Sequence, residues 1–146
     1  MALIAGLVAT LAAGLFAGAA LYITLVEHPA RVGCGFALAV TEFAPSYKRA
    51  TVMQVPLAVA GAAAGVVQWA QEGGLGWLVG GGLLVSVVPF TLLVIRPING
   101  RLLDPSLDET SREAGVLLAR WGRLHAVRSA LSLVAFGSFL VLLTRG

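Results

Sequence analysis

The sequence is poor in charged residues, cysteine and histidine. Charged side chains make up 12% of the 146 residues, whereas an average soluble protein has about 25%. So little charge argues against a disordered chain and against an ordinary water-soluble domain. The one cysteine, Cys34, excludes a disulfide within the chain. No motif surrounds it, so we interpret it as a small residue rather than a nucleophile.

Long apolar runs take the place of the missing charge. Hydrophobic residues make up 58% of the chain, and the mean hydropathy is +0.91. A helix needs about 20 apolar residues to cross a bilayer, and four such runs occur, at residues 3–26, 51–70, 75–95 and 124–143. We therefore predict an all-α, four-transmembrane-helix bundle that forms a single membrane domain over residues 1–146. No Lys or Arg precedes the first run, which also exceeds the roughly 7 to 15 residues of a signal-peptide core, so we interpret it as a span.

Basic residues gather in two of the three segments between these runs. Residues 27–50 and 96–123 contain Lys and Arg, whereas Glu72 is the one charged residue between the second and third runs. Because cytoplasmic loops retain Lys and Arg, we expect both basic segments to be cytoplasmic and both termini to be extracytoplasmic. We expect an integral protein of a bacterial inner membrane. The basic residues lack interleaved aromatic residues, so we predict no nucleic-acid partner.

The last span is predicted to extend into the cytoplasm as a helix. Asp104-Pro105, followed by Ser106 and Glu109, is typical of a helix start, with a capping side chain, a proline in the first turn and an acidic residue near the positive helix end. The helix is therefore expected to begin near residue 105 and to enter the membrane without a break.

This helix has a polar group on its apolar face. At 100° per residue, Trp121, His125 and Arg128 continue the apolar stripe, while the opposite face carries Arg112, Arg120 and Arg123. Polar side chains that face the interior of a membrane bundle are costly unless each finds a partner. They therefore indicate a site that opens toward the cytoplasm. The alternative is an aromatic belt residue and a snorkelling arginine at the membrane interface.

The start of the second span has a similar pattern. Tyr47, Thr51 and Gln54 repeat at helical spacing on one side. Three roles for Gln54 are compatible with this position: binding a ligand, bonding to another helix, or satisfying a backbone group freed by Pro56.

The two histidines, His28 and His125, are expected at the same membrane depth. Such a pair could act as acid and base, or bind a metal with Glu27 as an oxygen ligand. A metal site needs three or four ligands, and the sequence offers no tight ligand spacing. We therefore predict no dedicated metal or other cofactor, and expect neutral histidines that bond to Tyr47, Asn99 or a ligand; a metal between the histidines is the alternative.

Four stretches give the chain a resemblance to the anthrone oxygenase-like family of small four-helix membrane proteins, which includes the noranthrone monooxygenases. The most specific is the WxxxHxxR pattern in the last one. In chain order they are Glu27-His28-Pro29-Ala30, Tyr47-Lys48-Arg49-Ala50, Pro97-Ile98-Asn99 and Arg120-Trp121-Gly122-Arg123-Leu124-His125-Ala126-Val127-Arg128.

The resemblance implies a cytoplasm-facing pocket in which molecular oxygen oxidises an activated aromatic CH₂ to a ketone without a flavin or nicotinamide. On this interpretation His125 or His28 is the catalytic base. The substrate-binding residues would be Arg128 and Arg49 at a developing oxyanion, Trp121 on a flat ring, Asn99 and Tyr47 at a phenol or carbonyl, and Gln54.

Two other functions are compatible with the sequence. The first alternative is a non-enzymatic small membrane protein, with a binding or accessory role, whose polar residues only anchor helices. A transporter ranks below it, because the polar groups stay near one membrane edge rather than reaching the midplane. The expected partners are the lipid bilayer and a hydrophobic small molecule, and a homo-oligomer is compatible with the sequence.

Overall fold

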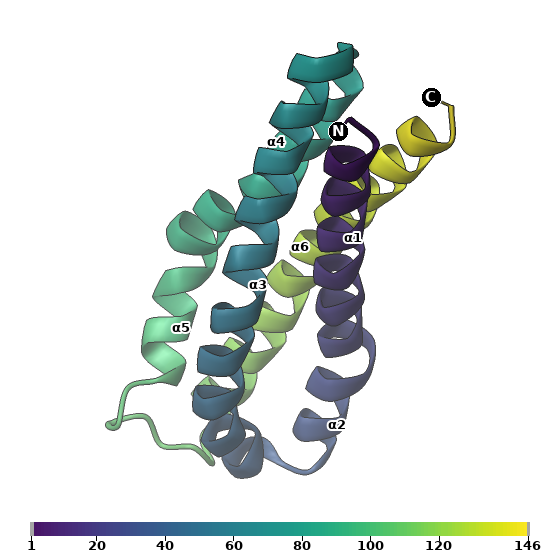
Figure 1. Ribbon diagram of the computed structural model, residues 1–146. Coiled ribbons are helices and arrows are strands. Elements are labelled where there is room, and N and C mark those ends of the chain that lie inside the picture. Colours follow the sequence, from purple (N-terminus) through teal and green to yellow (C-terminus); the bar gives the residue numbers. More distant parts are fainter. Residues whose placement is uncertain (1, 146) are drawn as a thin grey trace.

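The computed structural model describes residues 2–145, and in that range every regular element is helical (Figure 1). In chain order the elements are α1 (Ala2–Tyr22), the π-helical turn η1 (Ile23–Glu27), α2 (His28–Gly33), α3 (Phe36–Glu72), α4 (Leu75–Phe90), the π-helical turn η2 (Thr91–Ile95), α5 (Arg96–Leu102) and α6 (Arg112–Arg145).

These elements form four long rods, and each rod is long and apolar enough to cross a membrane. The rods cover Leu3–Gly33, Phe36–Glu72, Leu75–Leu102 and Arg112–Arg145. The predicted all-helical class with four membrane-length helices is therefore confirmed. Both termini lie at one end of the bundle, and the α2–α3 turn and residues 103–111 lie at the other (Figure 1).

The segment 27–50, which we expected as a loop between spans, is almost entirely helical. Pro29 stands in the first turn of α2, where a missing N–H costs little. The chain then turns at Gly35, whose φ of 102° favours glycine, and α3 starts at Phe36. Ala39 and Phe43 are fully buried at helical spacing, so packing against the bundle stabilises this first part of α3.

Two π-helical turns interrupt the rods that begin with α1 and α4. An X-Pro pair directly follows each turn: His28-Pro29 follows η1, and Arg96-Pro97 follows η2. A proline ring clashes with the carbonyl four residues earlier and removes a hydrogen bond. A wider turn accommodates this clash while the helix continues, and π turns of this kind are frequent at functional sites.

The predicted helix start at Asp104-Pro105 is wrong, because residues 103–111 form turns. Asp104 accepts hydrogen bonds from the Ser106 backbone N–H and hydroxyl, both at 2.8 Å. These bonds hold the pKa of the Asp104 carboxyl below its usual value. The helix α6 instead begins after Ser111, whose hydroxyl accepts a bond of 3.1 Å from the Ala114 N–H.

At the end of the bundle that holds the termini, glycines let large rings pack against helix backbones. Phe139 is fully buried there, in a cluster that extends along the bundle to Leu84 and Phe16. A Cβ on Gly80 would lie 2.7 Å from the Phe139 ring, whereas a Cβ on Gly82 would meet no atom within 4 Å. Close packing of this kind holds membrane helices together, because lipid supplies no hydrophobic drive between them.

We predict that Gly80→Ala destabilises the protein by about 1 to 3 kcal/mol, because the buried Phe139 ring has no room to move. Gly82→Ala is the matched control on the same helix and should stabilise by up to about 1 kcal/mol, since it only removes backbone freedom. Unfolding in detergent, followed by circular dichroism, measures both. Equal stability of the two variants would contradict the packing described here.

Candidate functional site

The indole of Trp121 lies at the centre of a buried group of rings. Its Nε1 donates a hydrogen bond of 2.9 Å to Asn99 Oδ1, so α5 fixes the ring on α6. His125 stacks on it with 4.7 Å between ring centroids, His28 lies at 5.0 Å, and Phe43 meets it edge-on at 5.4 Å. Trp121 therefore positions both histidines.

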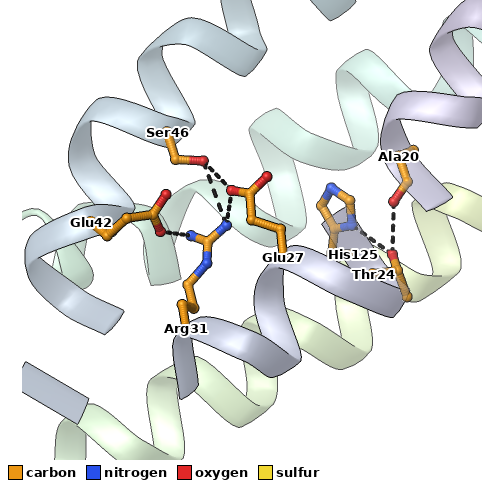
Figure 2. A network of polar contacts seen from close by, with 7 residues as sticks. All are labelled: Ala20, Thr24, Glu27, Arg31, Glu42, Ser46 and His125. Atoms are coloured by element: carbon orange, nitrogen blue, oxygen red, sulfur yellow. Dashed lines mark hydrogen bonds and ion pairs between the residues drawn. The ribbon is translucent and has the colours of Figure 1, made fainter. Parts of the chain in front are cut away.

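His125 is 2% exposed, and one of its two ring nitrogens has a partner. Its Nδ1 lies 3.0 Å from the hydroxyl of Thr24 on η1 (Figure 2). The same hydroxyl lies 3.0 Å from the Ala20 carbonyl and 2.7 Å from the Ser129 hydroxyl. If Thr24 donates to the Ala20 carbonyl, its oxygen accepts the Nδ1 proton, and Nε2 then carries the lone pair of a base.

A small interior cavity lies beside His125. Its volume is about 20 Å³, which is room for about one water molecule. Residues from three rods line it: Ile23, Arg31, Phe43, Ser46, Tyr47, Ala50, Thr51, Gln54, Trp121, His125 and Arg128. The cavity therefore collects a base, a guanidinium and several hydroxyl or amide groups.

Arg128 and Gln54 meet at this cavity. The Arg128 guanidinium donates a bond of 2.5 Å to Gln54 Oε1, and its Cζ lies 5.2 Å from the centroid of the Phe16 ring. Two buried donors, Gln54 Nε2 and Arg128 Nε, have no hydrogen-bond partner in the part of the chain that the structure describes. Such donors favour an acceptor oxygen at this position.

Arg31 centres a second polar group between α2 and α3. Its side chain is 4% exposed, forms ion pairs with Glu27 and with Glu42, the latter at 3.0 Å, and donates a hydrogen bond of 3.5 Å to the Ser46 hydroxyl (Figure 2). Ser46 also donates to Glu27 Oε1 at 2.5 Å. Because each buried charge has a partner, the network ties the two helices together without an isolated ion.

The structure brings most of the sequence-derived site residues together but not all. Trp121, His125, Arg128, Tyr47 and Gln54 line the cavity. The remaining three do not. Asn99 is occupied by the indole, His28 packs against Trp121 and over Gly122, and Arg49 is exposed in a groove between α1 and α3.

The two faces expected for α6 are confirmed. Ala114, Leu118, Trp121 and His125 are buried, while Arg112, Arg120 and Arg123 are exposed. Within residues 2–145, no three His, Cys, Asp or Glu side chains gather as metal ligands. The described residues around Trp121 thus offer two imidazoles and no cluster of the size that a zinc site requires.

The sequence interpretation missed five residues, namely Thr24, Arg31, Glu42, Ser46 and Ser129. The Glu27–Arg31 ion pair could have been predicted, because the two residues are four apart on a helix. The same spacing puts Glu42 and Ser46 on one face of α3. The hydroxyls of Thr24 and Ser129 lie 2.7 Å apart although 105 residues separate them. No local pattern predicts that contact.

Comparison with known proteins finds a matching family and a curated relative. The anthrone oxygenase family matches residues 43–138, a range that includes Trp121, His125 and Arg128. The anthrone oxygenase tpcL of Aspergillus fumigatus is 42% identical over 53 residues, which cover 34% of this chain and 33% of that protein. The match thus spans about a third of the length of this curated relative. No solved structure matches the chain. On the extent of the family match, the chain belongs to the anthrone oxygenase family.

Proposed function

We propose that this protein is a membrane-embedded oxygenase that oxidises an activated CH₂ of a hydrophobic, anthrone-like aromatic to a ketone with O₂. The observation that carries the proposal is that the His125 imidazole lines the same small cavity as Gln54 and Arg128, whose Nε2 and Nε have no partner among the described residues. A base and an oxyanion site are thereby adjacent. The family membership supports the same chemistry.

The reaction begins with proton transfer to His125. Nε2 removes one proton from the CH₂ group, and the charge moves through the ring system onto the carbonyl oxygen. The electron-rich carbon then adds O₂ and a proton to form a hydroperoxide. Loss of the second C–H proton breaks the O–O bond, so that the products are a ketone and one water molecule.

The other cavity residues stabilise and orient these species. The Arg128 guanidinium and the Gln54 amide donate to the oxyanion, which forms only after proton removal and therefore gains most from fixed donors. Trp121, held by Asn99, keeps the His125 ring in place. Thr24 fixes the tautomer from the side opposite to Nε2.

We further propose that the site lies near the cytoplasmic side of a bacterial inner membrane, with both termini outside. The support is the distribution of charge: residues 27–50 and 96–123 hold most of the basic residues. Reporter fusions test it. A periplasm-active reporter fused after residue 145 should be active, and a cytoplasm-active one should not.

Our first activity prediction concerns His125. His125→Gln should lower O₂ uptake with emodin anthrone by about 100-fold or more, because a positioned base contributes roughly 10²–10⁴ in rate. Uptake is measured with an oxygen electrode in detergent. Ser138→Ala, an outward hydroxyl on the same helix, is the control and should match the parent protein.

Two outcomes would change the identity of the base or the proposed function. A loss with His28→Gln but not with His125→Gln moves the base to His28. No uptake above background by the parent protein favours a binding or accessory role for the polar cavity.

A second prediction concerns the oxyanion. Arg128→Met should lower kcat by about 10²-fold with a smaller change in KM, because the charge it stabilises develops after binding. Arg123→Met removes an exposed guanidinium of α6 and should leave kcat unchanged. Equal effects of the two substitutions would show that Arg128 acts only through general electrostatics.

A further inference from the structure

The interior cavity is far smaller than any aromatic substrate. At about 20 Å³ it has room for a water molecule, whereas ligand pockets usually measure about 300 to 1,000 Å³. The substrate of the proposed reaction therefore needs a second, larger space in contact with the first.

Such a space lies on the side of the bundle between α1 and α3. This lateral groove measures about 540 Å³ and is lined by Ala19, Tyr22, Ile23, Glu27, Glu42, Pro45, Ser46, Arg49, Ala50 and Met53. The lining residues occupy successive turns of two neighbouring rods, so the groove runs along the helices. Ile23, Ser46 and Ala50 also line the interior cavity. The groove and the cavity that holds His125 therefore adjoin each other at these three residues.

The lining of the groove combines apolar and charged side chains. Ala19, Tyr22 and Met53 are apolar, and Glu27, Glu42 and Arg49 are charged. Glu27 Oε1 is engaged by Arg31 and Ser46, while its second oxygen points away from both (Figure 2). That oxygen is suited to accept a hydrogen bond from a phenol.

The boundary that the groove and the cavity share has an unusual backbone at Ile23. Ile23 is the first residue of the π turn η1 and is 7% exposed. Like Ala50, it lines both the groove and the cavity. A π turn is less regular than an α-helix and is often found where a helix has a functional role.

We propose that the lateral groove is the binding site for the aromatic substrate, which enters from within the bilayer with its apolar rings along Ala19 and Met53 and a phenolic hydroxyl on Glu27. The substrate class is a flat, fused-ring phenol. This inference rests on the proposed oxygenase function for its link to His125. Its binding step is testable without turnover.

The first test fills the groove. Ala19→Phe should weaken binding of 1,8-dihydroxyanthraquinone, a probe that has no CH₂ to oxidise, by about tenfold or more. Ala60→Phe adds the same ring at an exposed position of α3 outside the groove and should change the Kd by less than about twofold. Quenching of intrinsic tryptophan fluorescence in nanodiscs reports binding. Equal affinity in both variants overturns the proposed site, whether or not the protein oxidises anthrones.

The second test examines the phenol contact. Glu27→Gln should weaken binding of the dihydroxy probe about tenfold more than it weakens binding of unsubstituted 9,10-anthraquinone. The reason is that a hydrogen bond to a charged acceptor is stronger than one to an amide. A merely structural role for Glu27 would weaken both probes alike, and that result overturns the phenol contact. If both binding tests give the expected result but the parent protein takes up no oxygen, the groove stands as a binding site and the oxygenase function is rejected.

Discussion

A histidine, an indole N–H and two guanidinium groups lie inside a bundle whose outer surface is largely hydrocarbon, and the apolar side chains around them offer no hydrogen bonds. Each therefore needs a polar partner, because an unpaired polar group in such surroundings costs several kcal/mol. The partners are Thr24 for His125, Asn99 for Trp121, Gln54 for Arg128 and the two carboxylates for Arg31. This requirement determines how the rods meet at the end of the bundle away from the termini.

The two ends of the bundle satisfy different constraints. At the end with the termini, glycines let backbones come close to the Phe139 ring. At the other end, polar side chains from three rods surround a small cavity. Close packing excludes water from the first region, whereas directional bonds in the second orient a base.

Hydrophobic patterning was sufficient to predict the four rods and the faces of α6, because long apolar runs and helical periodicity can both be read directly from the sequence. It also placed Trp121, His125 and Arg128 on one face. The start of α6 was not predictable in the same way. Asp104 and Asp108 form local turns with Ser106 and Thr110, and these compete with capping for the same side chains. The pairing of Thr24 with His125 depends on residues 101 positions apart, which no local pattern records.

The π turns also determine which side chains reach the interior. A π turn is geometrically an α-helix with one additional residue, and one residue corresponds to a rotation of about 100°. Buried positions in the first rod accordingly step by five from Ile23 to His28, then by three to Arg31. In an uninterrupted helix, His28 and Arg31 would turn away from Trp121, and in the third rod Asn99 would do the same. The two π turns thus determine which side chains of the polar site face inward, and removal of one residue from either turn would rotate the side chains that follow it by about 100° around the helix axis.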